Sequence, residues 1–302
     1  MICLNTDCQV ERIFIMRDYV ILTDSGSDLS KDKASEIGVK VIDLTVVKEG
    51  EAPVCDSQVD LAEFYDFLRT KKQANTSAVN VDIFEEAMEQ IIAEGKDVIY
   101  VGFSSGLSST YNSGRLAAEE ISAKYPDAKV YAVDTLCASL GQGLMVYLAA
   151  NMKKNGASID EVHDWLEANK LHLCHWFTVD DLMFLKRGGR VSAATAVMGT
   201  MLQIKPVMHV DNEGHLIKVS TARGRRASID ALFDKLKATA IEPASQTIFI
   251  CHGDCIDDAK YLAERIENEI HPKEIFIDYT GAVIGSHSGP GTLALFYLGT
   301  ER

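Results

Sequence analysis

The feature that most constrains the fold is the alternation of short β-rich runs with segments of helical periodicity. Residues 19–22 and 98–103 are typical of short buried strands, and residues 81–92 keep one helical face apolar. This order favours a mainly parallel sheet with helices on its faces. The helix expected over 139–154 is apolar on most sides, which predicts deep burial.

The alternation breaks at Asn155-Gly156, after which Ser158 and Glu161 form a capping box that starts a new helix. A chain of 302 residues is large for one core and natural for two. We therefore expect an α/β fold with two domains. The expected divisions are an N-terminal extension over 1–18, a first α/β domain over 19–157 and a second over 158–302. Met16 is a candidate start of the native product; otherwise the leader is a loosely attached extension.

Further elements are expected from the same patterns. The expected strands cover 39–47, 129–133, 171–177, 204–210, 247–251 and 275–279, and the expected helices cover 111–125, 228–239 and 257–270. No internal repeat or low-complexity tract interrupts them.

Composition excludes several classes of protein. The chain is 47% hydrophobic and 25% charged, as in soluble globular proteins, and no apolar run approaches the ~20 residues of a membrane helix. The formal net charge of −14 repels nucleic acid phosphates, so no nucleic acid partner is expected.

Cysteine usage points to a reducing compartment. The seven cysteines are scattered without a C-x-x-C pair, which favours reduced thiols in the cytoplasm over a disulfide framework. Two segments, 172–175 and 251–255, resemble metal ligands faintly. Because they lie within or at the end of expected strands, we interpret them as fold residues and expect no metal.

Three hydroxyl-rich segments are candidates for an anion site: 23–29, 75–77 and 104–110. Hydroxyls and the free N–H groups of a helix N-terminus suit an anionic oxygen group, and ligands of parallel sheets bind outside the carboxyl ends of strands. Each segment alone also reads as an ordinary cap or turn. Three such segments at the same edge of the sheet would favour an anion-binding site.

A glycine-rich stretch over 281–291 encloses His287. Glycines let backbone approach a ligand closely, and a neutral imidazole both donates and accepts a hydrogen bond. This stretch is therefore a candidate wall of a site for an oxygen-bearing small molecule. An ordinary turn beside a surface histidine would have the same sequence pattern.

The segment Gly102-Phe103-Ser104-Ser105-Gly106 matches G-x-S-x-G between a strand and a helix, the context of a hydrolase nucleophile elbow. A triad of Ser104, Asp278 and His287 is then possible in sequence order. Against it, no HGGG-type oxyanion loop precedes the motif. A serine hydrolase using Ser104 is the alternative hypothesis.

Two basic clusters, 186–190 and 223–226, stand out from the acidic background. Such clusters are usually solvated loops, but guanidinium groups also fit oxyanions. A third hypothesis is therefore a regulatory module that docks an acidic partner through Arg187 and Arg190.

Taken in order, the motifs resemble those of the DegV family of fatty-acid-binding proteins. The matching pieces are Thr23-Asp24-Ser25 with Asp28-Leu29, Thr76-Ser77, Ser104-Ser105-x-Leu107-Ser108-x-Thr110-Tyr111, Leu185-Lys186-Arg187-Gly188-Gly189-Arg190, Lys205-Pro206 and Gly285-x-His287-x-Gly289-Pro290-Gly291. The resemblance runs from about residue 19 to the end and implies two α/β domains with a long-chain fatty acid between them.

The resemblance also implies roles for single residues. Thr76 and Ser108 correspond to the hydroxyls that hold the carboxylate and His287 to the imidazole beside it, with Ser77, Ser104 and Ser105 around them. The implied protein is a carrier without catalytic residues or a cofactor, which presents its fatty acid to a separate ATP-dependent kinase that makes an acyl phosphate for phospholipid synthesis. Arg187 and Arg190 are then expected to face the kinase or phosphate. Transient contact with a membrane surface is a further expectation.

The chain departs from the family pattern at two places. Ala78-Val79 replaces the usual Gln-Pro after Ser77, and Ser109 replaces the usual Gly after Ser108. The first removes a proline that would fix φ, and the second adds a Cβ near the expected ligand. Both changes leave the expected carboxylate contacts in place but alter the loops that carry them.

Overall fold

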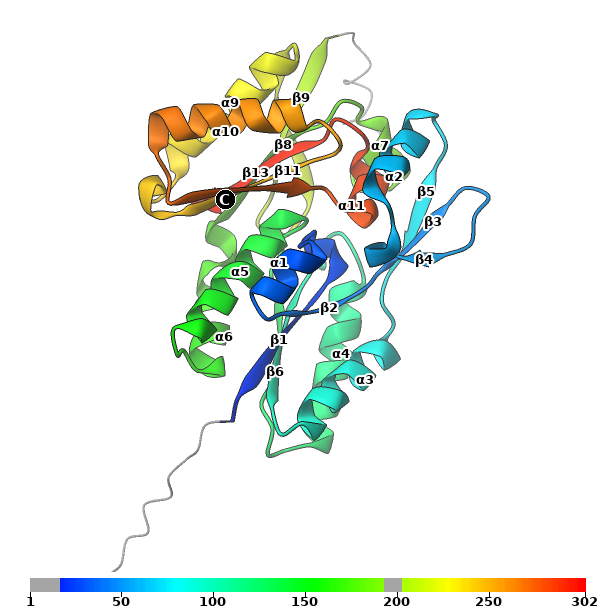
Figure 1. Ribbon diagram of the computed structural model, residues 1–302, viewed down its shortest axis with the longest axis vertical. Coiled ribbons are helices and arrows are strands. Elements are labelled where there is room, and N and C mark those ends of the chain that lie inside the picture. Colours follow the sequence, from blue (N-terminus) through cyan, green and yellow to red (C-terminus); the bar gives the residue numbers. More distant parts are fainter. Residues whose placement is uncertain (1–16, 193–202) are drawn as a thin grey trace, which may run out of the picture.

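In the computed structural model, which describes residues 17–192 and 203–302, the chain forms three β-sheets (Figure 1). The first is parallel, in the order β2-β1-β6-β7, and consists of β2 (Lys40–Ile42), β1 (Tyr19–Asp24), β6 (Asp97–Gly102) and β7 (Val130–Asp134). This sheet confirms the parallel arrangement predicted for the N-terminal half. The predicted start at Met16 lies outside the described residues.

Helices cover both faces of the parallel sheet. One face carries α3 (Val81–Ala93) and α4 (Thr110–Lys124); the other carries α5 (Leu140–Lys154) and α6 (Ile159–Asn169). The short α1 (Lys31–Glu36) contacts β2. The domain boundary expected at 157/158 stays a prediction, although α6, which follows it, packs on β6 and β7.

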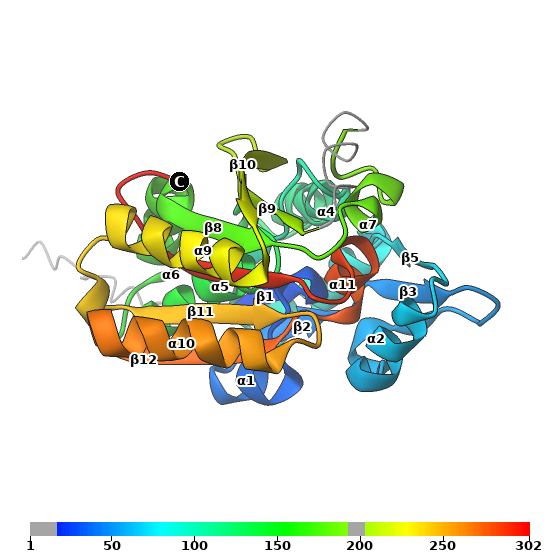
Figure 2. The same ribbon diagram turned by 90° about the horizontal axis from the view of Figure 1, so that it is seen from above.

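The second sheet has six strands and is mixed. Its order is β10-β9-β8-β13-β11-β12, and only the pair β11 and β12 is parallel. The strands are β8 (Leu173–Thr178), β9 (Ile204–Val210), β10 (Leu216–Arg223), β11 (Thr247–His252), β12 (Glu274–Tyr279) and β13 (Leu293–Leu298). Two long helices, α9 (Arg225–Thr239) and α10 (Ile256–Ile270), cover one face, and α5 lies on the other (Figures 1 and 2).

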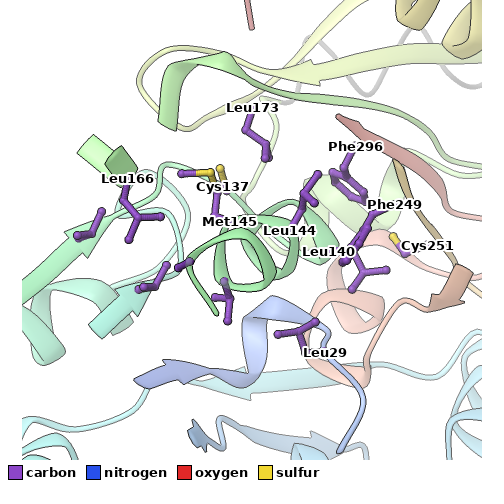
Figure 3. Close-up of a cluster of buried hydrophobic side chains, with 14 of the residues drawn as sticks. Leu29, Cys137, Leu140, Leu144, Met145, Leu166, Leu173, Phe249, Cys251 and Phe296 are labelled. Atoms are coloured by element: carbon purple, nitrogen blue, oxygen red, sulfur yellow. The ribbon is translucent and has the colours of Figure 1, made fainter. Parts of the chain in front are cut away.

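Helix α5 joins the two sheets. It contacts β1 and β6 of the parallel sheet and β8, β11 and β13 of the mixed sheet. Figure 3 shows Leu140 and Leu144 of this helix beside Phe249 and Phe296, and Met145 farther along it near Cys137. A helix between two sheets has no solvent face along most of its length, which explains its nearly uniform apolar sequence and confirms the predicted deep burial.

The third sheet is small and antiparallel, in the order β4-β3-β5, from β4 (Val54–Cys55), β3 (Thr45–Lys48) and β5 (Ala74–Ser77). With α2 (Leu61–Arg69), it packs against α11 (Ala282–Ser288). This sheet corrects two expectations. Residues 39–47 form two strands of different sheets, because the chain turns after Ile42, and residues 75–77 belong to β5 rather than to a loop of the parallel sheet.

The glycine-rich stretch near the C-terminus also differs from a simple turn, since its first half forms α11. In the part of the chain that the structure describes, no helix is long and apolar enough to cross a membrane.

Candidate functional site

A cavity of about 90 Å³ lies where the three sheets meet. Its wall is mostly apolar and comes from the loop after β1, the loops after β6 and β7, the mixed sheet and α11. The apolar and small lining residues are Gly26, Leu44, Phe103, Leu107, Ala138, Phe177, Leu185, Val210, Leu216, Cys251, Val283, Ile284, Ala294 and Phe296. Side chains of the parallel-sheet loops and of the mixed sheet therefore leave a cavity between them.

Thr76 and His287 meet at one end of this cavity. The Thr76 Oγ1 atom lies 2.9 Å from His287 Nε2, which joins β5 to α11 across 211 residues of sequence. Burial and, to a smaller extent, the positive charge of Arg190 lower the pKa of His287 to about 4. The imidazole is therefore neutral at physiological pH and can both donate and accept a hydrogen bond.

Arg190 lies beside this pair and also lines the cavity. Its guanidinium donates to the carbonyl oxygens of Leu107 (Nε, 3.2 Å) and Gly188, and it has no acidic partner within 4 Å among the described residues. Burial lowers the pKa of Arg190, yet an arginine keeps its proton. The site thus holds a half-buried positive charge that lacks a counter-ion in the described part of the chain.

Five further hydroxyls line the cavity, those of Ser108, Ser139, Thr280, Ser288 and Thr292. Three of them donate within the protein: Ser139 to Asp28, Thr280 to the Cys251 sulfur and Thr292 to the carbonyl oxygen of Gly289. Ser108 Oγ accepts from the backbone N–H of Thr110 (3.2 Å) and lies 2.9 Å from Thr110 Oγ1, where either hydroxyl can donate. When Thr110 is the donor, the Ser108 proton is available for a ligand. Ser288 is 5% exposed, and its Oγ has no hydrogen-bond partner among the described residues. Sequence reasoning missed Ser288, because a serine next to His287 gives no signal until α11 is known to turn it inward.

The structure thus brings four of the predicted residues together around one cavity: Thr76, Ser108, Arg190 and His287. Ser77 and Ser105 are exposed, and neither they nor Ser104 belongs to the cavity wall. Arg187 is exposed on α7 (Met183–Arg187), where its guanidinium lies 4.5 Å from the ring of Phe184.

Ser104 has a structural environment rather than that of a nucleophile. Its buried Oγ donates to the carbonyl of Gly214 (2.9 Å) and accepts from the N–H of Gly106 (3.2 Å). Ser104 also lacks the positive φ of a strained elbow. Gly106 is needed for packing, since a Cβ there would lie 2.7 Å from the carbonyl oxygen of Glu213.

The possible triad is not assembled. His287 bonds to Thr76, and Asp278 lines a different cleft, where its Oδ1 accepts from the N–H of Tyr279. The G-x-S-x-G pattern is therefore explained by the contact between the loop after β6 and the turn between β9 and β10.

The residues considered as metal ligands lie in or beside β8 and β11. His175 accepts from the N–H of Ala138 (3.3 Å), and burial raises the pKa values of Cys251 and Cys255 to about 12, so both are thiols. Within residues 17–192 and 203–302, no three His, Cys, Asp or Glu side chains are placed to hold a metal ion.

A second, smaller space lies on the outer side of His287. It has a volume of about 30 Å³, and Asn75, Arg187 and Gly188 line it together with His287. The imidazole therefore separates the apolar cavity from a small pocket beside the exposed Arg187.

Comparison with known proteins identifies the family. Residues 18–300 match the family model described as "Uncharacterised protein, DegV family". A DegV domain-containing protein of Clostridium perfringens is 46% identical over 289 residues, which cover 95% of this chain and 99% of that protein.

Solved structures share this fold. A DegV lipid binding protein from Thermotoga maritima is similar with a TM-score of 0.83 and 30% identity, covering 94% of this chain and 99% of that one. A DegV family protein from Thermus thermophilus, described as binding fatty acid, gives a TM-score of 0.83 and 31% identity, with 94% and 100% coverage. These matches confirm the resemblance seen in the motifs and the two-domain α/β architecture. The chain belongs to the DegV family.

Proposed function

We propose that this protein binds a long-chain fatty acid in the cavity, with the carboxylate at the end formed by Thr76 and His287. The observation that carries the proposal is the composition of the wall: a guanidinium without a counter-ion in the described chain, the imidazole of His287 and the hydroxyls of Thr76, Ser108 and Ser288 line one largely apolar cavity. Relatives described as binding fatty acids support it.

The chemistry of the polar end suits a carboxylate. A buried carboxylate needs charge and hydrogen-bond donors, because leaving it bare in apolar surroundings is costly. Arg190 supplies the charge, and Thr76, Ser108 and Ser288 can each supply a proton. With Nε2–H of His287 donating to Thr76, the Thr76 hydroxyl is free to donate to the ligand. Ser104 would support the loop after β6, whereas Ser77 and Ser105 are exposed outside the cavity wall and would not contact the head group.

The apolar wall suits the tail. Burying a tail of about fourteen methylenes at ~0.8 kcal/mol each contributes roughly 11 kcal/mol. Association costs of ~4–15 kcal/mol oppose this gain. The tail therefore supplies much of the binding free energy, and the polar end fixes the orientation of the ligand.

The second part of the proposal concerns the use of the ligand. The protein acts in the cytoplasm as a carrier rather than an enzyme, and presents the carboxylate to a partner ATP-dependent fatty acid kinase, which forms an acyl phosphate for phospholipid synthesis. The pocket between His287 and Arg187 supports this, because it gives a phosphate a short approach to the head group beside an exposed guanidinium. Transient contact with a membrane surface would supply the fatty acid.

Lipid extraction tests the first part. Protein purified without detergent should release a fatty acid that mass spectrometry detects at near one per chain. Thr76→Val combined with Ser108→Ala should lower that occupancy, and Ser77→Ala should not. Protein that carries no lipid and takes up none from fatty-acid vesicles would contradict the proposal and favour a regulatory module.

The kinase step needs a separate test. The loaded protein, ATP and a fatty acid kinase subunit should yield acyl phosphate, trapped as a hydroxamate. Arg187→Ala should slow this step and leave lipid occupancy unchanged. Product formation that is equal with and without this protein would exclude the carrier role.

A further inference from the structure

A second cleft, of about 560 Å³, lies between α1, the turn before β3 and the end of β12. Four carboxylates line it, and we call it the carboxylate cleft: Asp28, Asp43, Asp56 and Asp278. Within the described residues, none of the four has a Lys, Arg or His partner within 4 Å, although Lys31 also lines the cleft. The fatty-acid proposal uses none of these side chains.

Asp28 is the group that most needs a ligand. It is 7% exposed; its Oδ2 accepts from the Ser139 hydroxyl, and its Oδ1 has no well-aligned hydrogen bond among the described residues, although the backbone N–H of Gly281 lies close enough to lower the pKa of the carboxyl. Burial raises the pKa of Asp28 well above its usual value, and the charges of Asp56 and Asp278 raise it further, while nearby N–H and O–H groups offset part of this. A buried carboxylate in this state is stabilised by a proton or by a cation.

Asp56 faces the same space. A Cβ on Gly281 would lie 2.6 Å from Asp28 Oδ1 and 3.7 Å from Asp56 Oδ2, so both oxygens border the space that this glycine leaves open. Burial and, to a smaller extent, the charge of Asp43 raise the pKa of Asp56 to about 6, although its Oδ1 accepts from the backbone N–H of Val283 (3.2 Å) and Ser25 also donates to this carboxylate. One cation with several donors can therefore satisfy carboxylates on both sides of Gly281.

The spacing of the carboxylates selects the class of cation. No three acidic side chains of the described chain converge closely enough for a metal ion. An ammonium or guanidinium instead carries three to five N–H donors that point in different directions. Apolar side chains complete the wall, among them Leu29, Val39, Val41, Val59 and Leu61, and these suit a methylene stem.

We propose that the carboxylate cleft binds an aliphatic amine or guanidine, with its cationic head between Asp28 and Asp56 and its methylene stem against the apolar wall. The cation can belong to a free polyamine or to a lysine or arginine side chain of another protein. The site is distinct from the fatty-acid cavity, although Ser139, the partner of Asp28, lines that cavity from the other side.

Calorimetry on the full chain tests the proposal. The probes are agmatine, which carries both cationic groups on a methylene stem, and 1,4-butanediol as an uncharged stem. Agmatine should bind and butanediol should not. Asp28→Asn and Asp56→Asn should each weaken agmatine binding at least tenfold, and Asp234→Asn, at an exposed carboxylate on α9, should leave it unchanged.

Further binding measurements distinguish a free polyamine from a protein side chain as the ligand. Binding of agmatine alone identifies a site for a free polyamine, and equal binding of N-acetyl-arginine amide identifies a site for a protein side chain. Thr76→Val should not affect agmatine, which separates this site from the fatty-acid cavity. If Asp28→Asn fails to fold, Asp56→Asn and Asp278→Asn decide. No binding of either cation, or binding unaffected by the folded cleft variants, would overturn the proposal.

Discussion

Thr76 and His287 are 211 residues apart in sequence and 2.9 Å apart in the structure, where the Thr76 hydroxyl meets His287 Nε2. The contact joins the small antiparallel sheet to α11 at the polar end of the cavity. Each side chain is oriented by the other, so a change at one should be detected at the other.

Thr76→Val keeps the shape of the side chain and removes its hydroxyl. We expect fatty-acid affinity to fall about 10- to 100-fold, because a hydrogen bond to a charged group contributes about 1.5–3 kcal/mol. Displacement of a fluorescent fatty acid measures this change. Ser77→Ala is the matched control, since Ser77 is the next residue of β5 and is exposed. Equal losses in both variants would show a general weakening of β5 instead.

His287 should make the protein sensitive to acid. Its pKa in the folded state is about 4, below the ordinary 6.5, so the unfolded chain takes up this proton first as the pH falls. The contribution of His287 to stability is complete above pH 6.5 and is lost as the pH falls toward 4, by about 1.4 kcal/mol per unit.

Urea unfolding between pH 4 and 7 measures this effect. His287→Gln should flatten the dependence of the unfolding free energy on pH, and His215→Gln, at an exposed imidazole, should not. Bound fatty acid should raise the pKa of His287, because a carboxylate favours the charged ring. An NMR titration of the imidazole with and without ligand checks this, and identical curves would place the carboxylate elsewhere.

Gly188 holds space for the His287 ring. A Cβ at residue 188 would lie 2.4 Å from His287 Nδ1, closer than real contacts allow. Gly188→Ala should therefore rotate the imidazole away from Thr76 and weaken fatty-acid binding about tenfold, with a small change in stability. A crystal structure of the variant would show the ring position. An unmoved ring with full affinity would contradict this account of the contact.

Ser104→Ala should destabilise the fold rather than abolish a reaction. It removes one buried and one partly buried hydrogen bond and leaves the Gly214 carbonyl without its partner, which costs about 1–3 kcal/mol. Thermal unfolding measures this cost, with exposed Ser105→Ala as the control within about 0.5 kcal/mol. Fluorophosphonate labelling of the wild type that disappears in Ser104→Ala would instead revive the hydrolase alternative.

Much of the fold could be predicted from local patterns. The period of apolar residues located the helices α3, α4, α5, α9 and α10 and most strands of both large sheets, because burial of one face imposes that period on the chain itself. The nearly uniform apolar character of α5 also indicated its place between layers. Short elements such as β4 and α11 were not predicted, because two to seven residues are too few to show a period.

The site depended on the tertiary structure. The order of the motifs identified the family, and with it Thr76, Ser108 and His287, but the hydroxyl-rich segments do not share one sheet edge as expected: Thr76 reaches the cavity from a separate sheet. The inward placement of Arg190 and Ser288 and the meeting of Asp28 with Asp56 follow from contacts between segments far apart in sequence. Local periodicity determines which elements form; only the packing of the three sheets around α5 and α11 decided which side chains meet.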